Sequence, residues 1–294
     1  MKLAAIDIGS NAARLLVVEP KPYQNGEFDY SKLNFLRIPL KLGYDVFNTG
    51  YIGPEKMHQF NQAMQIFKQL MELYGVQYYR ACATSAMRDA KNASFIVEEI
   101  LRNTGIEIEI ITGQEEASIL YETHVAETLN HNKGNYLYMD VGGGSTELSL
   151  YSNQKLQFKE SFNVGTIRLL QNKLTDKDWE PVKQFIKNEL KSHIPYTLIG
   201  SGGNINKLFS LSKTKEGKPL KYNHLKKYLT EMSELSVAER MHEFNLREDR
   251  ASVIVPALKI YTQIMRWAEV DEIFVPKIGL ADGIVKQLHQ QYLT

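Results

Sequence analysis

The chain has 294 residues, a length that suggests two domains, and its composition is that of a globular protein. Hydrophobic residues make up 43% and charged residues 23%, which argues against a disordered chain, a collagen or a coiled coil. The 35 Lys and Arg residues nearly balance the 34 Asp and Glu residues, giving a net charge of +1 without the overall basic field of a nonspecific nucleic-acid binder. Any anion site must therefore be local.

The sequence favours a soluble protein of a reducing compartment. The N-terminus reaches Asp7 before an apolar stretch of signal-peptide length, and no apolar run approaches the roughly 18 residues of a membrane span. The single cysteine, Cys82, cannot form an intramolecular disulfide or a cysteine zinc site. We expect Cys82 to be a buried small hydrophobic residue, and the protein to be cytoplasmic, with neither a membrane nor a nucleic acid as partner.

Two β-rich runs separated by a Gly-Ser-Asn turn open the chain, a pattern typical of a β-hairpin. Gly53-Pro54 later marks the start of a long helix with apolar residues on one face. The first half is predicted to contain strands at 2–8, 13–19, 33–42, 78–85 and 106–112, and helices at 54–74, 92–103 and 114–129. This alternation indicates a sheet covered by helices.

A polar loop around residues 131–135 precedes a second series that again begins with strands. The second half is predicted to contain strands at 136–142, 145–151, 155–162, 196–200 and 272–275. It is also predicted to contain a helix at 176–193, long helices through 247–268 and a last helix that begins at about residue 281. We place an N-terminal domain at residues 1–125 and a C-terminal domain at 126–294, and we allow for the last helix packing back on the first domain.

An internal repeat links the two halves. Residues 4–18 align with residues 137–151, so that Asp7 falls on Asp140 and Arg14 falls on Glu147. Each half thus opens with a strand, an Asp-x-Gly turn and a second strand. A chance match of two short segments is the alternative, but their position at the start of each α/β half argues for duplicated domains.

The two repeated turns are suited to phosphate and a divalent cation. An aspartate at a strand end stands beside glycines, whose backbone amides no side chain obstructs. In the richer loop, Gly142, Gly143 and Gly144 are followed by the hydroxyl donors Ser145 and Thr146. It is not a P-loop, because Gly-Lys-Ser/Thr is missing and a strand follows. The alternative is that the glycine loop is only a tight turn. The matching turn at Asp7 in the first half argues against this alternative.

Two further segments could bind anions. Ser201 and Gly202 lie in a Gly-Ser-Gly-Gly-Asn loop between a strand and a helix. The sequence is equally compatible with a structural turn and with an anion-binding site at this loop. Arg88 follows Thr84 and Ser85 at a strand-to-helix turn and could grip phosphate oxygens with two N–H groups. A surface arginine paired with a neighbouring carboxylate is the alternative.

The sequence Thr-Gly-Gln-Glu-Glu-Ala at 112–117 opens a helix directly after a strand. Acidic residues in a first helical turn are often only favourable to the helix dipole. In a cleft that also carries Asp7, Asp140 and Glu147, a carboxylate could instead act as a general base toward water. So many carboxylates around a phosphorylated substrate would require Mg²⁺. The seven histidines show no metal-ligand spacing and are interpreted as structural or surface residues.

Together these segments resemble the exopolyphosphatase and guanosine pentaphosphate phosphohydrolase (Ppx/GppA) family. The resemblance spans nearly the whole chain, in family order, through AAIDIGSNAARLLV, ATSAMRDAKN, ITGQEEA, MDVGGGSTEL, SFNVGTIRL, LIGSGGNINKL and GLADGIV. The family belongs to the actin, sugar-kinase and Hsp70 ATPase superfamily. The resemblance therefore implies an α/β protein of two duplicated ribonuclease-H-like (actin-like ATPase) domains with an interdomain cleft.

The resemblance also implies roles for individual residues. It assigns Glu116 as the base that activates water, with Glu147 as a second catalytic carboxylate. Asp7, Asp140 and Glu147 would bind or orient Mg²⁺ and water. The implied phosphate-binding residues are Asn11, Arg14, Arg88, Gly142, Gly143, Gly144, Ser145, Thr146, Ser201 and Gly202.

The implied activity is that of an exopolyphosphatase, which removes terminal phosphate from inorganic polyphosphate with Mg²⁺. The alternatives are a guanosine pentaphosphate phosphohydrolase, a noncatalytic protein that binds guanosine tetra- or pentaphosphate, and a kinase or chaperone-type ATPase of the superfamily. Ala281, Asp282, Asn204 and Ser252 depart from the family pattern and bear on substrate preference and activity. The length matches the short two-domain form, which favours shorter polyphosphates, and a homodimer is plausible.

Overall fold

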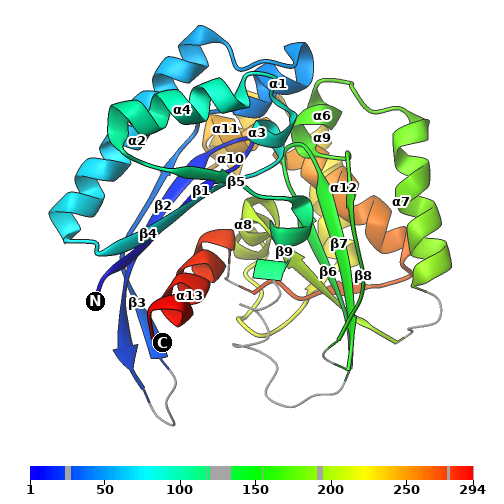
Figure 1. The fold of residues 1–294 in the computed structure, drawn as a ribbon. Helices are drawn as coiled ribbons and strands as arrows, with labels where there is room; N and C mark the ends of the chain where they lie inside the picture. The colour runs from blue at the N-terminus through cyan, green and yellow to red at the C-terminus, as the bar shows by residue number, and fades with distance from the viewer. Residues whose placement is uncertain are drawn as a thin grey trace. The chain divides into compact units, whose positions relative to one another are not determined.

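The computed structural model describes residues 1–23, 28–116, 118–119, 134–153, 155–190, 195–276 and 279–293. The chain divides into two compact units, Met1–Thr123 with Ile278–Thr294, and His124–Lys277 (Figure 1). The C-terminal helix α13 (Leu280–Leu293) therefore belongs to the first unit. Of the helix predicted at 114–129, residues 114–116, 118 and 119 are described and helical, and the others lie outside the described residues.

The first unit is built on a five-stranded sheet in the order β3-β2-β1-β4-β5. Its strands are β1 (Leu3–Ile8), β2 (Ala13–Pro22), β3 (Phe28–Ile38), β4 (Tyr78–Ala83) and β5 (Ile108–Ile110). β1 pairs antiparallel with β2 and parallel with β4. The strand predicted at 33–42 is wrong at its end, because Lys41 turns the backbone with φ of 55° and helix α1 (Leu42–Thr49) begins.

Helices cover this sheet because the strand side chains alternate between two apolar faces. On one face, Leu3, Leu16 and Cys82 pack against Ile284 and Leu288 of α13. The helices beyond α1 and α13 are α2 (Pro54–Tyr74), α3 (Ser85–Asp89) and α4 (Ala93–Thr104). Proline at the first position and Gly75 at the C-cap, with φ of 67°, fix the two ends of α2.

The second unit repeats this plan with a four-stranded sheet in the order β8-β7-β6-β9. Its strands are β6 (Asn135–Val141), β7 (Thr146–Ser152), β8 (Lys155–Phe162) and β9 (Thr197–Ser201). Phe274 forms a parallel bridge with Ile199 of β9, at the position that β5 occupies in the first unit. β10 (Leu220–Lys221) and β11 (Glu272–Ile273) form a small separate pair.

Helix α12 (Ile254–Trp267) is the most buried helix of the second unit, with Ile260, Tyr261 and Ile264 inaccessible to solvent. The other helices are α6 (Thr166–Leu170), α7 (Asp176–Glu189), α8 (Gly203–Leu211), α9 (Tyr222–Ser233), α10 (Val237–Glu243) and α11 (Glu248–Ala251). α9 and α10 stand where no element was predicted; α9 buries Leu225 and Met232, whereas no residue of α10 is buried.

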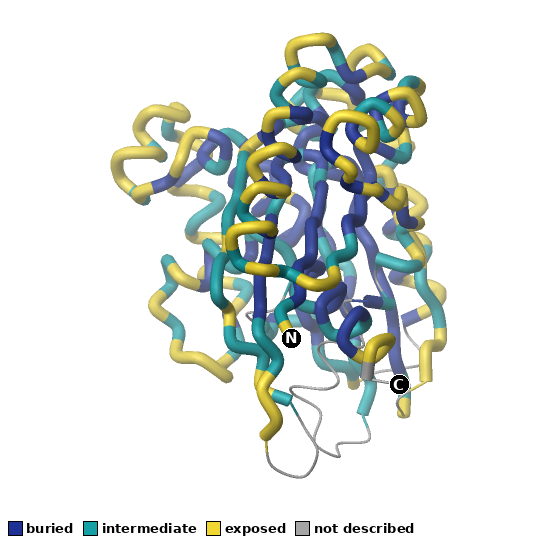
Figure 2. Tube along the Cα trace, turned by 60° about the vertical axis from the view of Figure 1, so that its left-hand side comes forward, coloured by how far each residue is buried: buried dark blue, intermediate teal, exposed yellow. Residues whose placement is uncertain are grey.

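The strand pairing confirms the internal repeat. Asp7 lies opposite Arg14 in the β1–β2 pair, and Asp140 lies opposite Glu147 in the β6–β7 pair, as the sequence alignment predicts. The central strands of both sheets are buried, while the outer faces of the helices are exposed (Figure 2). Within the described residues, no helix combines the length and apolarity needed to cross a bilayer.

Candidate functional site

In the first unit, the turn after β1 holds a buried carboxylate beside an arginine. Asp7 is 5% exposed, and its Oδ2 accepts a hydrogen bond of 2.5 Å from Nη1 of Arg14 on the neighbouring strand. The backbone closes the turn through a hydrogen bond from the Gly9 amide to the Ala12 carbonyl. Arg14, the arginine predicted to bind phosphate, is thus fixed at the mouth of the turn by its pairing with Asp7.

The same turn is anchored to α1 by its carbonyl groups. The Ser10 carbonyl accepts from the Gly43 amide at 2.8 Å, and the Asn11 carbonyl accepts from the Lys41 amide at 2.9 Å. The Ser10 hydroxyl is buried and has no hydrogen-bond partner among the described residues. A buried hydroxyl without a partner is costly, and a ligand that accepts its proton would remove the cost.

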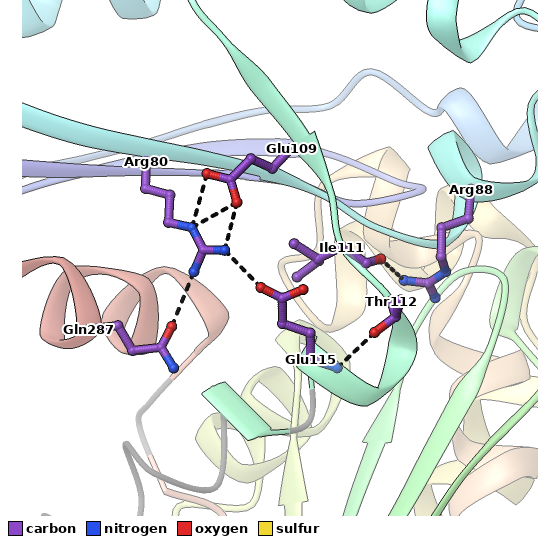
Figure 3. A network of polar contacts seen from close by, with 7 residues as sticks. All are labelled: Arg80, Arg88, Glu109, Ile111, Thr112, Glu115 and Gln287. Carbon is purple, nitrogen blue, oxygen red and sulfur yellow. Dashed lines mark hydrogen bonds and ion pairs between the residues drawn. The ribbon is translucent and has the colours of Figure 1, made fainter. Parts of the chain in front are cut away.

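Arg88 of α3 contacts the segment that carries the paired glutamates. Its Nη1 donates to the Ile111 carbonyl at 2.9 Å and to Oε2 of Glu116 at 3.2 Å. Figure 3 shows Arg88 reaching from α3 to the Ile111 carbonyl. The structure therefore joins a phosphate-binding candidate, Arg88, to the base candidate, Glu116, within one unit.

The two adjacent glutamates have different surroundings. We call residues 113–116 the acidic turn; they are helical, and the Thr112 hydroxyl caps the turn by accepting from the Glu115 amide at 3.1 Å. The Glu115 side chain is 42% exposed and lies 2.7 Å from Arg80. The Glu116 side chain is 12% exposed and lies against Arg88. Glu115 is thus held in an ion pair on the sheet, whereas Glu116 is the more buried carboxylate.

In the second unit, helix α6 orients the glycine loop, residues 142–146. The carbonyls of Gly142, Gly143 and Gly144 accept hydrogen bonds from the Thr166 amide, the Ile167 amide and the Arg168 side chain. In a planar trans peptide the N–H points opposite to the C=O. The amides of Gly143, Gly144 and Ser145 therefore point away from α6, as an anion-binding loop requires.

Gly165 permits this arrangement because a side chain there would collide with the loop. A Cβ on Gly165 would overlap the Gly143 carbonyl and the Gly144 backbone. The sequence analysis did not single out Gly165 or Arg168 as site residues. Both belong to SFNVGTIRL, the family-like segment, which was the available signal.

Glu147 lies on β7 directly after the glycine loop and is 3% exposed. Its Oε1 accepts from the Ser145 hydroxyl at 2.5 Å and from the Ser161 hydroxyl at 3.0 Å. Hydrogen bonds to the charged form stabilise a buried carboxylate. The sequence analysis missed Ser161, whose place beside Glu147 follows from the β7–β8 register.

The loop after β9 approaches the Asp140 carboxylate. Gly202 has a φ of 99°, and a Cβ at this position would lie 2.7 Å from Oδ1 of Asp140. The Ser201 carbonyl accepts a 2.9 Å hydrogen bond from the hydroxyl of Tyr261, which is fully buried. Burial raises the pKa of Tyr261 well above its ordinary value, so the phenol remains a neutral donor. Arg250 donates to the Gly203 carbonyl at the start of α8.

The carboxylates described above can be compared with the ligands that the expected Mg²⁺ would need. Within the described ranges, no group of three or more His, Cys, Asp and Glu side chains is gathered to hold a metal. Proteins commonly hold Mg²⁺ through one or two carboxylates and leave the remaining positions to substrate phosphates and water. Asp140, whose Oδ1 lies close to the backbone of Gly202, and Glu147 opposite it fit such a partial donor set.

The departures at the start of α13 have structural roles. Ala281 is buried in the core with Cys82. Oδ2 of Asp282 accepts from the Gly279 amide at 2.9 Å, and its Oδ1 lies 2.6 Å from Lys32. An acidic residue three positions after an N-cap commonly accepts the N-cap amide in this way. These two residues therefore fix the start of α13 on the first unit.

Comparison with known proteins places the chain among phosphatases. The model of the Ppx/GppA phosphatase family matches residues 33–291, and the chain belongs to this family. It is 27% identical to the crystal structure of the Aquifex aeolicus family member, with a TM-score of 0.75 over 99% of this chain and 98% of that one. The match confirms the mixed α/β fold with two sheets.

Two curated relatives show the range of the family. A bifunctional 3-dehydroquinate synthase/phosphatase of Fusobacterium nucleatum is 30% identical over 72% of this chain, which spans 34% of that protein's length. Exopolyphosphatase 1 of Mycobacterium tuberculosis is 22% identical over 97% of this chain and 87% of that protein.

Proposed function

We propose that this protein is an exopolyphosphatase, which releases orthophosphate from the end of inorganic polyphosphate. The proposal is supported by membership of a phosphatase family and by the match to an exopolyphosphatase along almost the whole chain. The observation that supports it is the pairing of Arg88 with Glu116, in which the arginine that we propose to bind phosphate lies 3.2 Å from the carboxylate that we propose as the base.

In this proposal Glu116 acts as the general base toward the attacking water. The terminal phosphoryl group brings its own negative oxygens to Arg88, which then no longer needs Glu116 as its counterion. The released carboxylate can accept a proton from water held near the phosphorus atom. The water oxygen forms a bond to the terminal phosphorus while the bond from that phosphorus to the bridging oxygen of the remaining chain breaks. Glu116 takes the proton of the water and then releases it to solvent, which restores the base.

The glycine loop would bind phosphoryl oxygens through the amides of Gly143, Gly144 and Ser145. Fixed N–H donors stabilise the negative charge of a phosphoryl transition state without reorganising during the reaction. Asn11, Arg14, Ser201 and Gly202 are proposed to hold phosphate as well. When bound, Mg²⁺ would neutralise phosphate charge, and Asp140, Glu147 and Asp7 are the carboxylates proposed to hold it.

The test is a substrate panel of polyphosphates of several lengths, guanosine pentaphosphate and ATP, each with and without Mg²⁺. Phosphate release from polyphosphate is the expected result. Phosphate release only from guanosine pentaphosphate, or only from ATP, would show that polyphosphate is not the substrate. Polyphosphate or nucleotide binding without phosphate release would indicate a noncatalytic sensor.

Paired substitutions then test the base. Glu116→Gln keeps the shape but cannot accept a proton, so turnover should fall about 10²-fold to 10⁴-fold while polyphosphate still binds. Glu115→Gln keeps the proposed base and should lose less than Glu116→Gln. Glu98→Gln, at an exposed position of α4, is the matched control and should keep the wild-type turnover. Arg88→Ala should weaken binding as well as turnover. Near-normal turnover of the Glu116→Gln variant would overturn the assignment of the base.

A further inference from the structure

Arg80 of β4 joins three elements of the first unit through one guanidinium group (Figure 3). Its Nε lies 3.1 Å from Oε2 of Glu109 on β5, and its Nη2 lies 2.7 Å from the same oxygen. Nη2 also donates to Oε1 of Glu115 at 2.7 Å, and Nη1 donates to Oε1 of Gln287 on α13 at 3.1 Å. Arg80 thus connects β5, the acidic turn and α13.

The Arg80 network is suited to fixing positions. The hydrogen bonds that Arg80 donates to Glu109 raise the pKa of Arg80, so its charge is permanent. A guanidinium presents its N–H groups in a rigid plane, and three partners in different directions can use it at once. The Arg80 side chain is 20% exposed, so water competes less for these contacts than it does at an open surface.

The helix α13 gives this network a rigid support. Next to Gln287, the side chains of Ile284, Val285 and Leu288 are buried against β1, β2 and β4. The burial of these three side chains therefore fixes the backbone position of Gln287. Through Arg80, the acidic turn is therefore attached to the packed core of the unit and not to a surface loop.

Holding the Glu115 side chain in place also sets the direction of the Glu116 side chain. Adjacent residues of a helix point about 100° apart, at 3.6 residues per turn. When Arg80 holds Glu115 toward β5 and α13, Glu116 is directed away from them, and it lies beside Arg88. The sequence carries two adjacent glutamates, and the Arg80 contact distinguishes them.

We propose that Arg80 is a positioning residue that fixes the acidic turn through Glu115, so that Glu116 is presented in one orientation. This inference rests on the proposed function, in which Glu116 activates water. Arg80 itself touches no reacting group in this scheme. Its effect should appear in the rate of the chemical step more than in substrate affinity.

The kinetic test compares Arg80→Gln and Arg80→Lys with Arg102→Gln, a control arginine exposed on α4. Arg80→Gln should lower kcat about 10-fold to 100-fold with little change in KM, because a small misplacement of a catalytic group costs rate. Arg80→Lys should recover only part, since one ammonium cannot serve three partners. In a double variant, Glu115→Gln should lower kcat little further than Arg80→Gln does alone, because both substitutions weaken the same contact between Arg80 and Glu115.

Amide hydrogen exchange tests the positioning without any turnover. In Arg80→Gln, the amides of residues 113–116 should exchange at least about tenfold faster, whereas those of β1 and β4 should keep their wild-type rates. If exchange accelerates but the wild type hydrolyses no polyphosphate, the turn is fixed by Arg80 and the proposed function is wrong. Unchanged exchange, or a kcat equal to that of Arg102→Gln in an active enzyme, would overturn the role of Arg80.

Discussion

Asp140 and Glu147 lie directly opposite each other in the β6–β7 register, at the positions where the first unit pairs Asp7 with Arg14. Directly opposed residues of antiparallel strands share a face of the sheet, and like charges there repel. The duplication has thus produced one neutral pair and one pair of carboxylates. We propose that the second pair binds a cation, and that this cation is Mg²⁺.

Asp140→Asn should therefore raise the Mg²⁺ concentration that phosphate release requires, since it removes one negative charge from this pair. A titration of Mg²⁺ against the initial rate measures the shift. Glu160→Gln, at an exposed position of β8, is the matched control and should leave the midpoint unchanged. A midpoint for Asp140→Asn equal to that of the control would contradict a metal role for Asp140.

Gly165→Ala should disrupt the glycine loop, because the added Cβ overlaps the backbone of Gly143 and Gly144. Overpacking of this kind costs about 1–3 kcal/mol, so the thermal unfolding midpoint should fall. Polyphosphate binding should weaken in parallel, as the amides of the loop move. Gly134→Ala meets only ordinary contacts and serves as the control. Equal midpoints and equal binding for the two variants would refute this interpretation.

His289 of α13 should make stability fall in mild acid. It is 2% exposed, and its Nδ1 lies 3.0 Å from the Tyr30 hydroxyl. Burial, with a smaller effect of the N-terminal ammonium group, lowers the pKa of His289. The unfolded chain therefore binds the proton more readily, and the contribution of His289 is full above about pH 6.5 and is lost as the pH falls toward the lower folded pKa.

The measurement is the thermal unfolding midpoint between about pH 5 and 8, for the wild type and for His289→Gln. The difference between the two curves isolates this histidine from other titrating groups. The wild type should lose more stability than the variant as the pH falls. Parallel curves would show that protonation of His289 does not destabilise the fold.

Cys82 should be inert toward thiol reagents in the folded protein. Burial raises the pKa of Cys82 to about 12, so almost no thiolate exists near pH 8. Mass spectrometry after treatment with iodoacetamide should find the native chain unlabelled and the denatured chain labelled once. Rapid labelling without denaturant would mean that α13, which packs over Cys82, opens readily from the sheet.

The sequence by itself determined the duplicated plan and the place of the two Asp-x-Gly turns in it. Strand alternation, glycine loops and caps are local features, so the predicted helix at 54–74 matches α2 and the repeat gave the register of Asp7 with Arg14 and of Asp140 with Glu147. The segment resemblance likewise predicted the family.

The tertiary structure alone decided which neighbours these residues have. Arg80 meets Glu115 and Gln287, which are 35 and 207 residues away along the chain. The grouping of α13 with the first unit and the contact of Ser161 with Glu147 are also nonlocal. Such contacts depend on strand order and helix packing, because side chains distant in sequence meet only when apolar faces far apart in the chain are buried together.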